Sequence, residues 1–214
     1  MRENAPMGRA VLQWTVVLLA GACAVPAQSK RADDLGVGKI LVSTRRAGDP
    51  LFAKSVILLV RYNEQGALGL MINRRTTMSI SRALRELNAA ASHSEPVFVG
   101  GPVELDTVFA LTRAAEKPEG ATVVTGGISF IVAKSALEQA LGGATKPDEF
   151  RVYLGYCGWG PKQLENEMRY DAWYIFSKNE DAAFDPQPDM LWSRLIDKAE
   201  AQAARLDFAP RLPR

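Results

Sequence analysis

The sequence predicts a single α+β domain built on a mixed, largely antiparallel sheet. Short β-branched or aliphatic runs outnumber the helical patterns along the chain. These runs do not alternate regularly with helices long enough for crossover connections, which disfavours a doubly wound parallel sheet. The composition, 47% hydrophobic and 23% charged, is typical of a globular protein. Residues 38–205 exceed the roughly 100–150 residues of a typical domain, so one core can form without disulfides.

The strand candidates are bounded by turn residues. The runs at 55–62 and 69–73 flank Asn63-Glu64-Gln65-Gly66, which predicts a hairpin with a turn glycine. The other runs share β-branched or aromatic side chains and lie at 39–42, 96–99, 108–112, 122–125, 128–132, 151–156 and 172–176.

Four helices are predicted from apolar spacing and end signals. Apolar residues at i, i+3, i+4 and i+7 over 80–87 follow Ser79, a candidate cap. Ser135 to Glu138 has the form of a capping box, with a helix over 136–141 and Gly142 just past its end. Pro161 suits the first position of a helix reaching about residue 169, and the last helix follows Asp189.

Residues 1–27 have the layout of a secretory signal peptide. Arg2 and Arg9 precede an apolar stretch, and Val25 and Ala27 suit the positions before a cleavage site. We therefore expect an exported, periplasmic protein without a membrane span after cleavage. One alternative is a lipoprotein anchored at Cys23, and another is an uncleaved anchor or a misassigned start on a cytoplasmic protein. Residues 28–37 are expected to form a charged linker, 38–205 the domain and 206–214 a C-terminal tail.

Charge and ligand-forming residues restrict the possible partners. Lys and Arg number 26 against 24 Asp and Glu, which makes direct nucleic-acid binding an unfavoured interpretation because such proteins usually have a strongly basic face. Two cysteines and one histidine, without metal-ligand spacing, predict neither a transition-metal site nor a cofactor.

Three segments are candidates for a binding surface. Residues 154–165 predict a strand that runs through a glycine turn into a helix, and the turn amides could receive an anion. The spacing matches neither the dinucleotide fingerprint nor a P-loop, so a purely structural turn is the favoured interpretation. Gly100-Gly101-Pro102 is a second turn of the same kind, and Asn73 with Arg74 and Arg75 could hold an anionic group. The candidate surface comprises Asn73, Gly100, Gly101, Pro102, Gly158, Trp159, Gly160, Gln163 and Glu165.

No catalytic residue is assigned. Cys157 would need a neighbouring base to act as a nucleophile, and the single histidine, His93, is predicted in an exposed loop. Packing is therefore the favoured role of Cys157. Trp159 and Trp173 are likewise favoured as core aromatics over ligand stackers. Glu165 and Glu167, two apart on a helix, do not share a face.

Several motifs occurring in order along the chain resemble the YqgE/AlgH family. The motifs are Asp49-Pro50-Leu51-Phe52, Ser55-Val56, Gly66-Ala67-Leu68-Gly69-Leu70 with Ile72-Asn73, Gly100-Gly101-Pro102-Val103, and Leu154-Gly155-Tyr156-Cys157-Gly158-Trp159-Gly160-Pro161 with Gln163-Leu164-Glu165. The resemblance covers about 38–195 and implies an α+β fold with a barrel-like sheet core flanked by helices, in a bacterial protein without an established molecular activity. Some relatives are labelled transcriptional regulators.

The chain departs from the family pattern in three places. Residues 107–112 lack the Arg and His of an Arg-Gly-Phe-Val-Leu-His-like run, Cys157 replaces a small residue, and the export-type leader is unusual. The favoured hypothesis is a non-catalytic binding or regulatory module in the cell envelope, with an unknown protein or small-molecule partner. The alternatives are a metal-independent enzyme that uses the 155–165 glycine turn as an anion site, and a cytoplasmic transcriptional regulator. The absence of a helix-turn-helix pattern and of a basic stripe disfavours the last.

Overall fold

A computed structural model describes residues 28–29, 31–113, 117–143, 146, 148–177 and 180–207. Its strands are β1 (Gln28–Ser29), β2 (Ile40–Ser43), β3 (Val56–Asn63), β4 (Gly66–Met71), β5 (Arg75–Ser79), β6 (Pro96–Val99), β7 (Val103–Thr112), β8 (Thr122–Thr125), β9 (Ile128–Ile131), β10 (Phe150–Trp159) and β11 (Trp173–Phe176). Its helices are α1 (Ile80–Ala83), α2 (Lys134–Gly142), α3 (Gln163–Arg169) and α4 (Pro188–Asp207), with 3-10 turns η1 (Ala32–Asp34), η2 (Pro50–Phe52), η3 (Asn88–Ala90) and η4 (Glu180–Phe184).

The strands form a mixed, largely antiparallel sheet, as predicted. The pairing order is β1-β11-β2-β3-β4-β10-β7-β9-β8, and β6 pairs with both β10 and β5. The β6–β10 pair is parallel and the other pairs are antiparallel. This path is open at both ends among the described strands, so the sheet does not close into the barrel-like core expected from the resemblance.

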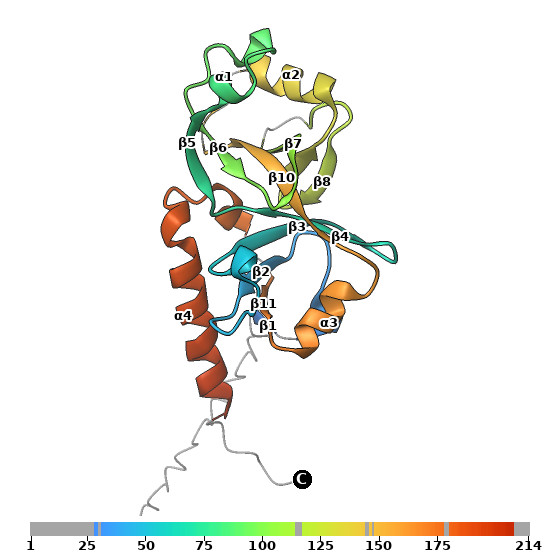
Figure 1. Cartoon of the computed structure of the whole chain (residues 1–214), viewed down its shortest axis with the longest axis vertical. Helices are drawn as coiled ribbons and strands as arrows, with labels where there is room; N and C mark the ends of the chain where they lie inside the picture. Colours follow the sequence, from blue (N-terminus) through green and yellow to red (C-terminus); the bar gives the residue numbers. More distant parts are fainter. Residues whose placement is uncertain are drawn as a thin grey trace, which may run out of the picture.

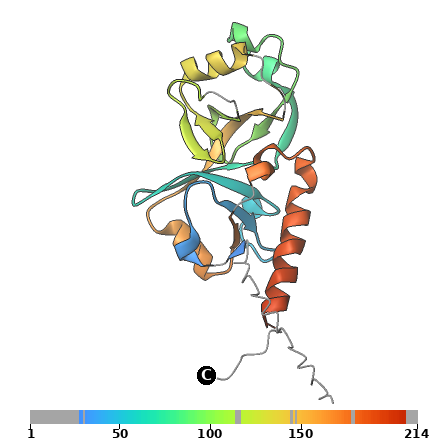
Figure 2. The ribbon, with the colours of Figure 1, turned by 180° about the vertical axis from the view of Figure 1, so that it is seen from behind.

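Two halves of the sheet lie one above the other, with β10 passing between them (Figure 1). The half with β5 to β9 carries α1 and α2, and the half with β1 to β4 and β11 lies between α3 and α4 (Figures 1 and 2). One hydrophobic cluster includes Ile40 from the lower half, Phe98 from the upper half and Trp192 from α4. This shared core makes the two halves a single domain.

The strands of the lower half are buried on both faces. In β3, Val56, Leu58 and Val60 belong to the cluster that includes α4, whereas Ile57 and Leu59 belong to the cluster beneath α3. Successive side chains of a strand point to opposite faces, so a strand covered on both sides is apolar at consecutive positions. This arrangement explains the unbroken apolar run that marks β3 in the sequence.

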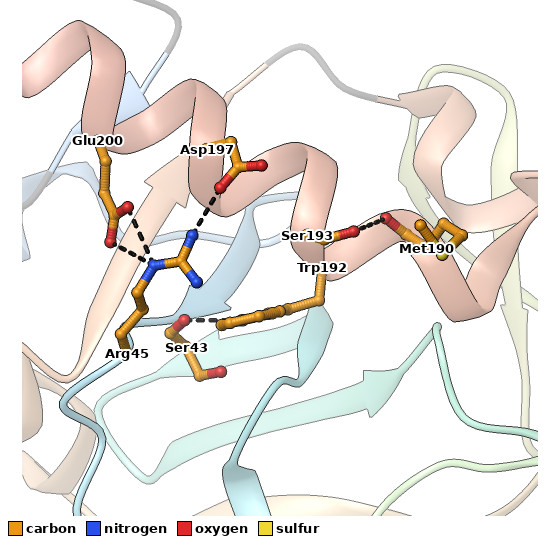
Figure 3. A network of polar contacts seen from close by, with 7 residues as sticks. All are labelled: Ser43, Arg45, Met190, Trp192, Ser193, Asp197 and Glu200. Atoms are coloured by element: carbon orange, nitrogen blue, oxygen red, sulfur yellow. Dashed lines mark hydrogen bonds and ion pairs between the residues drawn. The ribbon is translucent and has the colours of Figure 1, made fainter.

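Helix α4 is joined to β2 by one buried and two exposed polar contacts (Figure 3). The indole Nε1 of Trp192 donates a hydrogen bond of 2.8 Å to the carbonyl oxygen of Ser43. The guanidinium of Arg45 lies 5.4 Å from the centre of the Trp192 ring and pairs with Asp197 at 2.6 Å and Glu200 at 3.1 Å. Exposed ion pairs contribute little to stability, so the buried Trp192 is the main anchor.

Strand β10 changes partners in its middle. Its first part pairs with β6 and β7, its last part pairs with β4, and the register shifts between Leu154 and Tyr156. Gly155 lies at the shift with φ of 70°, a backbone conformation that glycine adopts without steric cost. A Cβ on Gly101 would lie 2.1 Å from the Tyr156 carbonyl carbon, so the two backbones touch here. These glycines therefore permit the crossing.

The structure corrects several predicted boundaries. The first helix ends at Ala83, although Ser79 caps it by accepting a hydrogen bond from the Arg82 amide, as expected. The capping-box prediction is wrong, because Ala133 occupies the N-cap of α2 and Ser135 lies inside the helix. Pro161 is not the first helical residue, since Lys162 forms the N-cap of α3 in a left-handed conformation. Strand β5 was not predicted, because its side chains are mostly polar.

The expected linker at 28–37 is partly integrated into the domain. Gln28 and Ser29 pair with Phe176 and Ile175 of β11, and Leu35 is buried in the cluster beneath α3. Helix α4 extends to Asp207, past the predicted start of the tail. The predicted signal peptide at 1–27, including Cys23, and residues 208–214 lie outside the described residues. Within the described part of the chain, no helix is long and apolar enough to cross a membrane.

We expect Gly101→Ala to lower the free energy of unfolding by about 3 kcal/mol, because the added Cβ overlaps the β10 backbone rather than a movable side chain. A change of this size corresponds to a Tm decrease of roughly 10 °C in a domain of this length. Thermal unfolding followed by circular dichroism measures it. Gly48→Ala is the matched control, since a Cβ added at Gly48 would have no atom within 4 Å. Equal Tm values for the two variants would contradict the close crossing.

Candidate binding site

The residues predicted as a binding surface fall into separate groups. Gly158, Trp159, Gly160, Gln163 and Glu165 lie together where β10 leads into α3. The turn at 100–102 packs instead against the middle of β10, and Asn73 lies just past the end of β4.

The polar groups at the β10–α3 junction bind one another. Gly158 is a strand residue paired with Leu68, which corrects its predicted place in a turn. The amide of Gly160 donates to Gln163 Oε1 at 3.1 Å, so it already has a partner. Glu165 accepts a 3.0 Å hydrogen bond from the hydroxyl of Tyr62, whose pKa is raised to about 12 by burial and by this bond. The junction is therefore largely satisfied from within.

Trp159 and Trp173 are core residues, as favoured from the sequence. They are 4% and 2% exposed, and their ring centres lie 6.3 Å apart. Both indole nitrogens donate to one oxygen, Oε2 of Glu167, at 3.0 and 2.8 Å. The side-chain amide of Gln163 donates to the other carboxylate oxygen of Glu167, Oε1, at 3.2 Å. The sequence analysis assigned no role to Glu167, although the two residues are four apart, a spacing that places them on one face of a helix.

The Gly100-Gly101-Pro102 turn and Asn73 also make internal contacts. The carbonyl oxygen of Gly100 accepts a hydrogen bond of 2.7 Å from the Met71 amide. Buried Asn73 accepts from the Val56 amide at 2.8 Å and donates to the Lys54 carbonyl at 3.0 Å, which closes the end of the β3–β4 hairpin. These contacts account for both segments as structural features.

The two residues weighed for catalysis are buried and apart. Burial raises the pKa of the Cys157 thiol, which lies 3.4 Å from the Gly100 carbonyl oxygen, so the thiol stays protonated. The predicted exposed position of His93 is wrong. Its side chain is buried because the Nε2 atom binds the Leu141 carbonyl at 2.9 Å, joining the loop to α2.

A cavity of about 480 Å³ lies where η4 and the start of α4 meet the ends of β5, β6 and β10. Both views of the ribbon show the start of α4 beside β5 (Figures 1 and 2). The walls of the cavity are mostly aromatic or proline side chains with a few charged groups, and this combination is typical of small-molecule sites. The lining residues are Arg75, Glu95, Pro96, Phe98, Asp148, Phe150, Arg151, Phe184, Pro186 and Pro188.

Arg151 is the buried charged group of this cavity. The residue is only 7% exposed, and its guanidinium carbon lies 4.7 Å from the Phe98 ring centre. Its Nη2 donates to the Asp185 carbonyl oxygen, and its Nη1 is buried. The Asp185 carboxylate itself is paired with Arg194. Burial lowers the pKa of Arg151, yet a guanidinium remains charged at neutral pH.

Tyr153 is a polar residue beside Arg151 and interacts with its guanidinium. The two residues are two apart in β10, so their side chains point to the same face. The Tyr153 hydroxyl is fully buried, and burial raises its pKa, although the charge of Arg151 and a side-chain hydrogen bond with Arg151 oppose this rise. Buried polar groups are nearly always paired, and here Arg151 and Tyr153 give each other a neighbour of complementary polarity.

A larger groove of about 710 Å³ lies between α1, α2 and β7. Its charged residues, Arg82, Arg85, Glu86 and Lys134, are exposed to solvent. Exposed charges are already solvated, whereas the Arg151 guanidinium in the wall of the other cavity is largely shielded from water. The Arg151 cavity is therefore the better candidate site. Among the described residues, no group of three or more His, Cys, Asp or Glu side chains is arranged to hold a metal ion.

One sequence signal pointed toward Arg151. An arginine occurs in the otherwise apolar run Phe150-Arg151-Val152-Tyr153-Leu154, within a predicted strand. A charge at an inward position of a buried strand is costly and therefore informative. The cavity itself had no sequence signal, because its opposite wall comes from Phe184 and Pro186, far along the chain.

The chain is similar to a widespread group of bacterial proteins. A family model described as AlgH-like matches residues 40–204. A UPF0301 protein of Chlorobium phaeobacteroides is 30% identical over 182 residues, covering 85% of this chain and 96% of that protein. A UPF0301 protein of Streptomyces avermitilis is 32% identical over 185 residues, covering 81% and 91%.

Solved structures agree with this similarity. The solution structure of the AlgH protein from Pseudomonas aeruginosa superimposes with a TM-score of 0.63 at 26% identity, covering 82% of this chain and 95% of that one. A crystal structure of a Corynebacterium diphtheriae protein gives a TM-score of 0.64 at 18% identity, covering 77% and 87%, and this likeness concerns the fold alone.

We expect Glu167→Ala to destabilise the domain by about 3 kcal/mol, since it leaves two buried indole N–H groups without an acceptor at a cost of about 1–3 kcal/mol each. Glu167→Gln keeps an acceptor oxygen and should lose about 1 kcal/mol. Urea unfolding followed by tryptophan fluorescence gives both values. Glu165→Ala is the control, because it removes one hydrogen bond from the Tyr62 hydroxyl and a long, exposed ion pair with Lys162 but no contact with an indole. A loss from Glu165→Ala as large as that from Glu167→Ala would refute the central role of Glu167.

Proposed function

The chain belongs to the AlgH-like family, and from that premise we propose that it is a non-catalytic binding module whose site is the Arg151 cavity. The ligand is a small molecule with an anionic group and an apolar body. The names of the related proteins, UPF0301 and AlgH, state no ligand or reaction. The proposal therefore rests on the chemistry of the cavity.

The buried guanidinium of Arg151, in the wall of the cavity, carries the proposal. Removing a charged group from water costs several kcal/mol unless other groups replace the lost solvation. The Asp185 carbonyl and the Phe98 ring replace part of it on two sides of the guanidinium. Arg151 lines the cavity, and an anion bound against its guanidinium would supply a charge-assisted hydrogen bond, which is stronger than a bond between neutral groups.

The remaining walls define the body of the ligand. Phe98, Phe150 and Phe184 supply aromatic surface, and Pro186 and Pro188 supply rigid apolar surface. Apolar walls contribute affinity through burial, and a single fixed charge orients the ligand. A volume of about 480 Å³ suits a small organic molecule rather than a polymer segment.

The geometry favours binding over catalysis. The enzymatic alternative relied on the amides of the 155–165 segment, but Gly158 is paired within the sheet and the Gly160 amide binds Gln163. Cys157, the nucleophile weighed for that alternative, is buried with a raised pKa. Both observations weaken the enzyme hypothesis.

We expect Arg151→Met to abolish anion binding, because the variant keeps an apolar side chain of similar length in the wall of the cavity but has no charge there. Isothermal titration calorimetry with 3-phenylpropanoate should show at least a tenfold loss of affinity, and circular dichroism should show that the variant is folded at the temperature of the titration. Arg61→Met, which removes an exposed arginine of β3, is the charge-matched control. Arg151-independent binding would refute the site.

We also propose that the module acts in the cell envelope after export by residues 1–27. Cell fractionation with intact-mass measurement of the untagged protein should find a soluble exported species that begins at Gln28. A species that begins at a lipidated Cys23 would indicate a membrane-tethered version of the module. A full-length cytosolic species would contradict export and favour the intracellular regulatory alternative.

A further inference from the structure

We infer that the groove between α1, α2 and β7 is a docking surface for an acidic amphipathic helix of a partner protein. The helix places apolar side chains on the floor of the groove and carboxylates against the arginines at its side. The groove shares no lining residue with the Arg151 cavity, so this inference goes beyond the proposed function and does not depend on it.

The groove lies at the end of the domain that carries α1 and α2, away from α3 (Figures 1 and 2). Leu84, just after α1, and Leu137 of α2 are buried in one hydrophobic cluster, and Val108 of β7 packs against that cluster. The side chain of His93 binds the Leu141 carbonyl oxygen, which joins the loop after α1 to α2. The fold therefore holds both sides of the groove in place without a partner.

Apolar side chains reach solvent along this groove. Met78 is 39% exposed and Val132 is 55% exposed, and both line it. Leu87 and Val108 line it as well and are only partly buried. Single exposed apolar residues are common on protein surfaces, whereas several that line one concave surface are typical of an interaction site. Apolar side chains of a partner would remove this surface from water, which favours binding.

The charges at the sides of the groove determine the charge of the partner. The exposed charged residues that line it are three cations and one anion, Arg82, Arg85, Lys134 and Glu86. Lys134 lies 3.9 Å from Glu138 of its own helix. Within the part of the chain that the structure describes, the side chains of Arg82 and Arg85 have no ion pair or hydrogen bond. Charges across an interface are arranged to be complementary, so the groove favours a segment with carboxylates.

Two features favour a protein segment over a nucleic acid as the occupant. The residues that line the groove include no aromatic side chain on which a base could stack. The chain has 26 Lys and Arg against 24 Asp and Glu, whereas nucleic-acid binders are usually strongly basic. An amphipathic helix that lays its apolar face into a hydrophobic groove is a common mode of recognition, with apolar anchors at i, i+3, i+4 and i+7. The groove combines the apolar floor and the cationic sides that such a helix needs when its polar face is acidic.

Fluorescence anisotropy with three labelled peptides of about 14 residues tests this inference. Each peptide has leucine at the i, i+3, i+4 and i+7 positions of a helix, with alanine and either glutamate, glutamine or lysine at the other positions. We expect the glutamate peptide to bind at least tenfold tighter than the glutamine peptide, and the lysine peptide to bind more weakly still. Added salt should weaken the glutamate peptide, because the charges of the groove are exposed and therefore screened.

Reversing the two arginines tests the charge of the groove. The double variant Arg82→Glu, Arg85→Glu should weaken the glutamate peptide at least tenfold, because attraction at two positions becomes repulsion. The double variant Arg46→Glu, Arg61→Glu is the charge-matched control, since it reverses two exposed arginines that do not line the groove. All four side chains are exposed, so both proteins are expected to fold.

A pair of valine variants tests the apolar contact. Val132→Ser should weaken the glutamate peptide by about threefold, because less apolar surface is buried. Val123→Ser is the matched control, since Val123 of β8 is 60% exposed but does not line the groove. Equal losses from the two variants would contradict a contact at Val132.

Other outcomes would overturn the inference. Equal affinities for the glutamate and glutamine peptides, or an affinity that the Arg82 and Arg85 substitutions leave unchanged, would exclude an acidic partner. A Kd weaker than about 1 mM for the glutamate peptide would exclude docking of such a helix. A dimer in sedimentation velocity that Val132→Ser dissociates would make a second copy of the chain the occupant. Arg151→Met should bind the glutamate peptide as tightly as the wild type, so failure of this inference leaves the Arg151 cavity unaffected.

Discussion

The close contact between the 100–102 turn and the middle of β10 is the constraint on which the rest of the structure depends. Because Gly101 and Gly155 lack side chains, the two backbones touch and β10 can leave β6 and β7 to join β4. One strand thereby belongs to both halves of the sheet, and the largest hydrophobic cluster extends across them. A side chain at this contact would separate the halves and open that cluster to water.

The crossing also determines where the candidate site forms. Before Gly155, β10 lies between β6 and β7, and its Arg151 and Tyr153 face the shared core rather than solvent. Helix α4 is fixed to β2 through Trp192, which holds η4 and Pro188 over the ends of β5 and β6. The cavity is therefore the space left where a helix anchored on one half reaches the other half.

The parts of this architecture that depend on local pattern were predictable. The hairpin at Asn63 to Gly66, most strands and the cap at Ser79 follow from alternation and turn chemistry over a few residues. The parts that depend on distant contacts were not. Strand β5 is mostly polar because its side chains are largely exposed. His93 is buried through its contact with a carbonyl oxygen of α2. Asn73 accepts a hydrogen bond from the amide of Val56 in the opposite strand of its hairpin. The glycines at 100–101 and 155 were predicted to form turns. Their role in a backbone crossing was not predictable, because it depends on which distant segment of the chain each one touches.

A buried arginine without a carboxylate is an expensive feature for a domain with this much apolar core. Hydrophobic clusters on both sides of the lower half supply ample stability without it, and an apolar side chain at 151 would pack against Phe98 at no desolvation cost. Local rules of folding are broken most often where a function requires it. A ligand that completes the solvation of Arg151 binds only the folded state, so it adds stability by mass action, about 2.7 kcal/mol at a hundredfold excess over Kd. The same buried guanidinium thus costs stability in the empty domain and returns it when the cavity is filled.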